Sequence, residues 1–318
     1  MDTDDDEVIQ YLDILTAAAE GEWRRHAISV PSVVYHYTSA AAFAAIIRSQ
    51  RLWATAASQL NDATELLHAA AALRDVLRAR AATAALPEYA VLYPPQAFHF
   101  DFARHDVMEV FVASLTSAED DLAQWDRYAD RGYGVAIGFD AQRLVALDAA
   151  THLRHHMGFV EVCYDQASQR EFWDFVVQAW ERLAAPAVAR SRGRARNPLL
   201  YLASWFGNLG GCACAFLPRM KSSHFAIERE WRLIHAHVAG LPHDCAVLAD
   251  HASKRHVELD LTQLAGKLPL SSVWLGPGVS TVESERQVAE LLQAHDLPDV
   301  QLHRSRVPLR LEQRALAL

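Results

Sequence analysis

Two glutamates stand two residues apart in the segment "FAIEREWRLIHAHV", where apolar and polar residues alternate as they do in a β-strand. This alternation predicts that Glu228, Glu230 and Arg232 share one strand face, with the two carboxylates roughly 7 Å apart. Carboxylates this close repel each other unless a cation such as Arg232 lies between them. Such a carboxylate can hold a sugar hydroxyl or stabilise a cationic transition state. A salt-bridge ladder on an edge strand is the structural alternative.

A second group of candidates, His36, Tyr37 and Thr38, ends a predicted strand in the segment "VVYHYTSAAAF". Tyr35 and Tyr37 share one face of this strand, and His36 lies on the other. A histidine at the junction of a strand and a helix can donate a hydrogen bond to a ligand, and nearby backbone N–H groups can hold an anion. The structural alternatives are a histidine satisfied inside the fold and a Thr38 that only helps to cap the helix.

Trp125 and Tyr128 stand three residues apart in "SAEDDLAQWDRYADRG", a predicted short helix that ends at Gly132. Residues three apart lie on one helical face. The two rings can therefore form an aromatic wall for a flat ligand such as nicotinamide or adenine. Packing into the core is the structural alternative.

Asn61 belongs to the segment "QLNDATE", which opens a long predicted helix. Asp62 and Glu65 have the spacing of a capping box, so helix capping alone explains them. Asn61 has no such local explanation and is therefore a candidate ligand residue.

Other motifs predict neither a metal site nor a phosphate loop. The histidines of "HLRHH" have no carboxylate or further ligand at a recognisable spacing, so we expect no metal. The segment "LGPGVSTVESE" lacks the lysine of a P-loop and the spacing of the dinucleotide fingerprint.

Four arginines alternate with small residues in "RSRGRARNP", the most linker-like stretch of the chain. A solvated loop is the structural interpretation. The functional hypothesis is that this stretch binds a nucleic-acid or protein acceptor through Arg190, Arg192, Arg194 and Arg196.

The elements that must position these residues alternate without a regular βαβ rhythm. The pattern predicts an α+β fold with a mixed or antiparallel sheet and surrounding helices. We expect an N-terminal helical extension over residues 1–30 and a single α+β domain over 31–318. A helical insertion is expected around residues 165–215, where an apolar helix is interrupted by Gly207, Gly210 and Gly211.

The composition is that of a globular protein without a strong partner signal. The chain has 318 residues, of which 51% are hydrophobic, and a formal net charge of −9, so an overall basic footprint for nucleic acid is absent. The acidic N-terminus lacks an apolar segment, and no run is long enough to span a membrane. The four cysteines form no CxxC pair. We therefore expect free thiols and a cytoplasmic protein that contacts no membrane.

Seven motifs together resemble an uncharacterised, mostly bacterial family, domain of unknown function 2971. They occur in the family's order over residues 33–311: "YHYTS", the helix followed by "LWAT", "LND" with Glu65, "ASLTSAEDDLAQWDRYADRGYGVAIGFD", "HFAIEREWRLI", "VWLGPGV" and "SRVPLRL". The stretch around 165–215 and the acidic N-terminus lie outside this resemblance.

The arrangement of strands is also similar, more distantly, to the His-Tyr-Glu branch of the ADP-ribosyltransferase superfamily. This resemblance implies that His36 binds the adenosine-side ribose of NAD and that Glu230, or else Glu228, holds the nicotinamide ribose. Tyr128, or Trp125 in its place, would match the tyrosine. The remaining expected cofactor-binding residues are Tyr37, Thr38, Asn61 and Arg232.

The function that this resemblance implies is transfer of ADP-ribose from NAD to a macromolecule, in the role of a toxin or phage-defence effector. NAD would be a substrate, and no metal is implied. Two alternatives stay open at this point. One is an NAD or nucleotide hydrolase, and the other is a non-catalytic module that senses a nucleotide or binds a partner.

Overall fold

The computed structural model describes residues 3–25, 29–60, 65–83, 108–155, 157–191, 198–238, 245–249, 254–263, 266–279, 281–309, 311–316 and 318. Its contacts divide the chain into two compact units. The helical unit comprises Met1–Ile28, Ala57–Val110 and Cys163–Ala226. The sheet unit comprises Ser29–Ala56, Phe111–Val162 and Ile227–Leu318. The predicted N-terminal extension and the predicted insertion thus contribute helices to one and the same unit.

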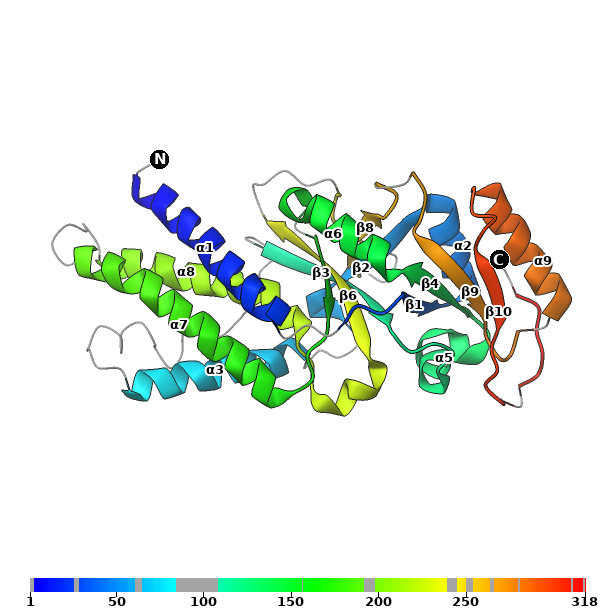
Figure 1. The fold of residues 1–318 in the computed structure, drawn as a ribbon, viewed down its shortest axis with the longest axis horizontal. Helices are drawn as coiled ribbons and strands as arrows, with labels where there is room; N and C mark the ends of the chain where they lie inside the picture. The colour runs from blue at the N-terminus through cyan, green and yellow to red at the C-terminus, as the bar shows by residue number, and fades with distance from the viewer. Residues whose placement is uncertain are drawn as a thin grey trace. The chain divides into compact units, whose positions relative to one another are not determined.

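The helical unit is built from helices α1 (Thr3–Arg25), α3 (Glu65–Thr83), α7 (Gln166–Ser191) and α8 (Pro198–Phe216), with the 3₁₀ helices η1 (Ala57–Gln59) and η3 (Leu217–Arg219). Helices α1, α7 and α8 lie side by side, and α3 packs against α7 (Figure 1). Aromatic contacts and a buried ion pair join them, since Trp23 meets Phe172 edge-on at 5.1 Å and Arg219 donates to Glu20 at 2.8 Å.

Helix α8 is continuous, so the prediction that its glycines interrupt it was wrong. A side chain at Gly211 would meet Leu12 of α1 at 3.2 Å, whereas Gly207 and Gly210 have open space around them. The glycine at 211 therefore serves the close approach of α1 and α8, and the packing of the unit outweighs the low helix propensity of glycine.

Ten strands of the described chain form the sheet, which confirms the predicted α+β class. Along its main path the order is β10-β9-β4-β1-β3-β2-β8-β7, and β6 pairs with both β3 and β5. Strands β9 and β10 are parallel, and the other pairs with a described register are antiparallel. The strands are β1 (Val33–Thr38), β2 (Arg51–Ala56), β3 (Met108–Thr116), β4 (Val135–Asp140), β5 (Met157–Glu161), β6 (Glu230–Val238), β7 (Leu248–Ala249), β8 (Arg255–Asp260), β9 (Leu270–Leu275) and β10 (Gln301–Arg304).

Short helices surround this sheet: α2 (Ala40–Ser49), α5 (Leu122–Tyr128), α6 (Ala141–His155) and α9 (Thr281–Ala294), with 3₁₀ helices η2 (Asp130–Gly132) and η4 (Ser223–Glu228). Ser39 caps α2 as its sequence predicts, because its hydroxyl accepts from the Ala42 N–H at 3.2 Å. Figure 1 shows α9 beside β10, where Glu285 and Arg304 form an ion pair.

The two faces of β1 enter different parts of the core. Val34 belongs to a large, mostly aliphatic cluster, whereas Tyr35 and Tyr37 belong to an aromatic cluster with Trp125 and Trp274. Side chains alternate along a strand, so His36 lies on the face of Val34, as predicted. In the described part of the chain, no helix is long and apolar enough to cross a membrane.

Candidate functional site

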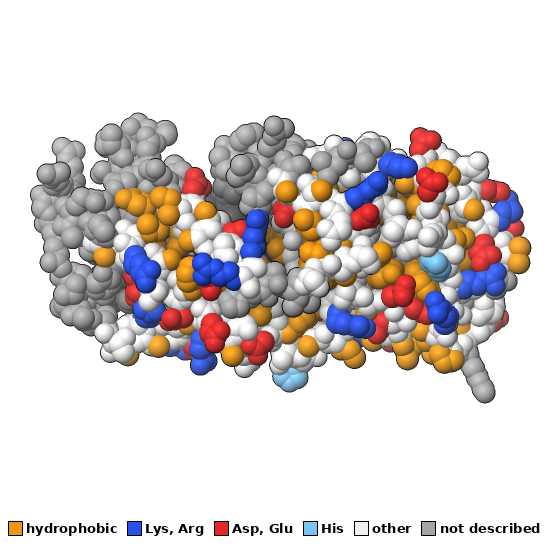
Figure 2. All heavy atoms as spheres, viewed as in Figure 1, with side chains coloured by type: hydrophobic (Ala, Val, Ile, Leu, Met, Phe, Trp, Pro, Cys, Tyr) orange, Lys and Arg blue, Asp and Glu red, His pale blue; other side chains and the backbone are white. Residues whose placement is uncertain are grey.

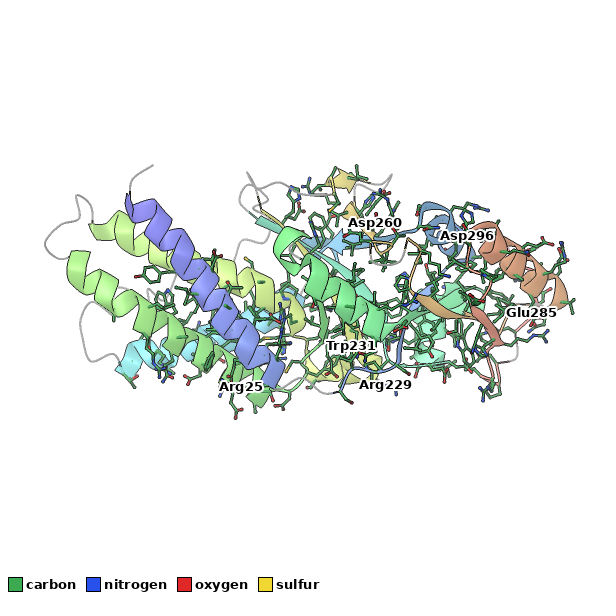
Figure 3. All side chains as sticks on the ribbon, turned by 45° about the horizontal axis from the view of Figure 1, so that its top comes forward. Arg25, Arg229, Trp231, Asp260, Glu285 and Asp296 are labelled. Atoms are coloured by element: carbon green, nitrogen blue, oxygen red, sulfur yellow. The ribbon has the colours of Figure 1, made fainter. Side chains whose placement is uncertain are left out.

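The two glutamates of the "EREWR" segment lie in different elements. Glu228 is the last residue of η4, and β6 starts at Glu230. Arg229 joins them with a left-handed φ of 44°, a conformation that costs an ordinary residue roughly 1–2 kcal/mol. Glu228 therefore lies outside the strand, and the common strand face predicted for three residues is left to Glu230 and Arg232. Figure 3 labels Arg229 and Trp231, the residues before and after Glu230, close to one another.

Glu230 and Arg232 form a closed, buried ion pair. The Nε and one terminal nitrogen of Arg232 each donate to a separate Glu230 oxygen, both at 2.9 Å. The exposed fractions of the two side chains are 6% for Glu230 and 1% for Arg232. Such a bidentate pair satisfies both charges inside the fold. Its geometry is that of a structural pair, with the carboxylate turned toward protein and away from solvent.

Glu228 has partners that extend to the surface. Its Oε1 accepts from Arg127 at 3.1 Å and from the Tyr128 hydroxyl at 3.2 Å. The Glu228 side chain is 8% exposed, whereas the Arg127 side chain is 51% exposed. Tyr128 as a whole is 38% exposed. The structure thus brings the predicted Tyr128 to one of the two predicted glutamates, and it adds Arg127, which the sequence analysis missed.

The loop over residues 117–121 fixes this arrangement. The Thr116 hydroxyl donates to the Glu228 carbonyl at 2.6 Å, and the Ser117 N–H donates to the Arg229 carbonyl at 3.0 Å. Asp121 caps α5 by accepting from the N–H groups of Ala123 and Gln124. Because α5 supplies both Arg127 and Tyr128, the loop sets the position of both donors to Glu228.

Tyr37 ties the loop to the sheet. Its hydroxyl donates to the Ala118 carbonyl at 2.9 Å and accepts from the Asp121 N–H at 3.0 Å. Burial is the main cause that raises the pKa of Tyr37, so the hydroxyl keeps its proton and can donate. Tyr35 acts in parallel by donating to Glu119 at 3.0 Å. The hydroxyls of the two tyrosines thus connect the loop over 117–121 to strand β1.

Trp125 belongs to this support and not to a ligand wall. Its ring is fully buried and meets Tyr37 edge-on at 4.8 Å. Its indole N–H donates to Asp120 at 2.8 Å, and the other Asp120 oxygen accepts from the Arg306 N–H at 2.7 Å. Of the two predicted wall residues, only Tyr128 extends its ring to solvent. The acidic run before α5 is the signal from which Asp120 and Asp121 could have been recognised as anchors.

His36 lies away from this group. Its Nδ1 is 3.0 Å from the Ser114 carbonyl, so the Nδ1–H tautomer donates to that oxygen. Burial is the main cause that lowers the pKa of His36, which favours the neutral imidazole. By strand alternation, Thr38 shares the face of His36 and Val34. The structure does not bring His36 to either glutamate, because Tyr37 alone of this trio lies on the α5 face.

Several predicted residues lie outside the described part of the chain. Asn61 is one of them, and Arg192, Arg194 and Arg196 are others. Arg190 falls in the last turn of α7, and its side chain is not described. Among the residues that are described, no group of three His, Cys, Asp or Glu side chains is arranged to hold a metal ion.

On the face shown in Figure 2, charged side chains of both signs are interspersed over the sheet unit, around β9, β10 and α9. A single-sign field is therefore not a feature of that face. Recognition of a charged ligand there would depend on individual side chains and not on a broad electrostatic patch.

Part of the chain matches one known protein family. Residues 124–233 match the model of a family described as "Protein of unknown function (DUF2971)". The matched range begins within α5 and ends within β6, so it contains Tyr128, Glu228, Glu230 and Arg232 but not His36. No curated protein and no solved structure matches the chain.

Proposed function

We propose that the sheet unit contains an ADP-ribosyltransferase-like site that cleaves the nicotinamide N-glycosidic bond of NAD and transfers ADP-ribose to a macromolecule. The observation that supports this most directly is the Glu228 carboxylate, held by Arg127 and Tyr128 at 3.1 and 3.2 Å beside a solvent-reaching aromatic ring. The resemblance to the His-Tyr-Glu branch supplies the reaction class.

Of the two glutamates, Glu228 is the better candidate for the reacting carboxylate. Both oxygens of Glu230 already accept from Arg232 inside the protein, and breaking a buried ion pair is costly. In Glu228, the two donors described share Oε1, and both reach solvent. A ligand hydroxyl would therefore compete for this carboxylate with side chains that can move into solvent, whereas at Glu230 it would compete with a buried guanidinium.

In the proposed reaction, the bond between C1′ of the ribose and the nicotinamide nitrogen breaks, and its electron pair leaves with nicotinamide. Positive charge develops on the ribose in an oxocarbenium-like transition state. Glu228 accepts a ribose hydroxyl proton in a hydrogen bond and stabilises that charge. A nucleophile of the acceptor then attacks C1′ and releases its proton to solvent. Tyr128 offers its exposed ring to the departing nicotinamide.

The fold argues against a direct role for His36 next to Glu228, because its side chain lies on the aliphatic face of β1 with Val34. Its predicted role as a ribose ligand is therefore a separate part of the proposal. The variant His36→Ala tests this role. If His36 binds the ribose, its loss should raise the KM for NAD. If His36 is only structural, its loss should lower the free energy of unfolding and leave the KM unchanged.

The test of the proposed function is incubation of the protein with NAD, with and without nucleic acid and a cell extract, followed by chromatography. The transferase predicts released nicotinamide together with ADP-ribose bound to a macromolecule. Released nicotinamide with free ADP-ribose would instead favour a hydrolase. No release under any of these conditions would contradict the proposal.

A non-catalytic nucleotide-binding module is the second candidate, and one observation favours it. Both glutamates already have protein donors, and His36 lies apart from them. For such a module, we expect NAD or ADP-ribose to raise the thermal midpoint of the protein without turnover.

The acceptor of the proposed transferase has its own test. If the acceptor is a nucleic acid, replacing the four arginines of residues 190–196 by Gln should reduce the salt dependence of binding.

A further inference from the structure

A second polar pair lies farther along β6. The Sγ of Cys245 is 3.4 Å from Nε2 of His235, within the range of a hydrogen bond to sulfur. His235 is 1% exposed, whereas Cys245 is half-buried. His235 is separated from Glu230 by four residues of the strand, so this pair is distinct from the proposed NAD site.

The surroundings of the pair hold the imidazole in place. The His235 ring lies 6.4 Å from the ring of Phe111 and 6.4 Å from that of His237. Cys245 packs against the aliphatic core of the sheet unit. A fixed imidazole next to a partly accessible thiol is an arrangement of nucleophile and base, because the thiolate is the reactive form of cysteine.

The other three cysteines have different surroundings. Burial raises the pKa of the Cys212 thiol to about 12 and that of the Cys214 thiol to about 11, so both stay protonated. Cys163 is half-buried like Cys245, but its thiol donates to a backbone carbonyl, that of Asp165, at 3.7 Å. Cys163 therefore matches Cys245 in exposure class, and the partner described for its thiol is a carbonyl oxygen in place of an imidazole.

We propose that Cys245 is an activated thiol that reacts with hydroperoxides and that His235 accepts its proton. The thiol proton moves to Nε2 of His235, and the thiolate sulfur attacks one oxygen of the peroxide. The S–O bond forms while the O–O bond breaks. The sulfur is oxidised to a sulfenic acid and the peroxide is reduced. The departing hydroxide, or the alkoxide of an organic hydroperoxide, takes the proton from His235 and leaves as water or an alcohol.

The test treats the folded protein briefly with hydrogen peroxide at pH 6 in the presence of a diketone probe for sulfenic acid. Mass spectrometry then measures labelling at each cysteine. A neighbouring imidazole raises the thiolate fraction of a cysteine more than it lowers the nucleophilicity of that thiolate. Cys245 should therefore be labelled at least about fivefold faster than Cys163. Equal labelling of Cys245 and Cys163 in the unaltered protein would overturn the proposal.

The variant His235→Gln separates activation from structure. The proposal predicts that labelling of Cys245 falls to the level of Cys163. If His235 only stabilised the sheet unit, its loss would instead lower the thermal midpoint and increase labelling at Cys245. Cys245 labelling that stays unchanged or rises in His235→Gln would rule out His235 as the proton acceptor. The variant Cys245→Ser confirms the assignment of the labelled peptide.

Discussion

The end of η4 and the start of β6 hold two buried glutamates that differ in the partners of their carboxylates. Glu230 meets a buried guanidinium with both oxygens, and Glu228 meets donors that reach the surface. A single left-handed residue, Arg229, separates them. Both carboxylates are buried, at 8% and 6% exposure of their side chains, so the difference shows how one turn can give one carboxylate a buried partner and the other partners that reach solvent.

The largest effect should come from breaking the buried pair. Glu230→Gln breaks the bidentate pair of a buried carboxylate with the buried Arg232 guanidinium, and we expect a loss of about 3–5 kcal/mol in the free energy of unfolding. Urea denaturation measures it. Replacing both residues by apolar ones of similar size, Glu230→Leu with Arg232→Met, should restore most of this loss. A Glu230→Gln protein as stable as the original would contradict the structural role.

Tyr37→Phe should have the next largest effect. The substitution removes a buried hydroxyl that both donates to Ala118 and accepts from Asp121, so the loop over 117–121 loses two of the hydrogen bonds that connect it to the sheet. We expect a loss of about 1–3 kcal/mol in the free energy of unfolding. Tyr35→Phe is the control. The Tyr35 hydroxyl donates to the side chain of Glu119, so its removal should lower the free energy of unfolding less than Tyr37→Phe does. A larger loss of stability for Tyr35→Phe than for Tyr37→Phe would contradict the conclusion that Tyr37 is the main connection between the loop and the sheet.

The helix α2 shows what the sequence could predict well. A serine before three buried apolar residues at helical spacing, Phe43, Ile46 and Ile47, gives a capped amphipathic helix, and the structure has it. Helix α6 is absent from the sequence-based prediction although Asp140 caps it, through its bond from the Arg143 N–H at 3.1 Å. Local signals of this kind are accessible from sequence because they depend on neighbours within one turn.

The candidate site was harder to predict, because its geometry depends on residues far apart in the chain. Alternation along a strand predicts the pairing of Glu230 with Arg232, but only if the strand start is known. The left-handed turn at Arg229 has no sequence signal, since glycine is the usual residue there. Nor does the sequence reveal that the Trp125 ring is buried against Tyr37, whereas the Tyr128 hydroxyl donates to Glu228.

Arg127→Gln should have the smallest effect on stability. Its side chain is half-exposed, so the ion pair with Glu228 is screened by solvent and should contribute less than about 1 kcal/mol. Urea denaturation in low and high salt measures this, and the small difference between the two proteins should shrink further in high salt. A loss comparable to that of Glu230→Gln would mean that the two glutamates do not differ in the way described here.

The most direct test of the central claim is the rate of nicotinamide release from NAD by Glu228→Gln and by Glu258→Gln. Glu258 is a matched control, because it too lies near an arginine and accepts from an aromatic donor, Trp53. With equal thermal midpoints, we expect Glu228→Gln to be slower than the original protein by about 10²–10³ and Glu258→Gln to be unchanged. A Glu228→Gln protein that releases nicotinamide at the original rate would contradict the assignment of Glu228 as the reacting carboxylate.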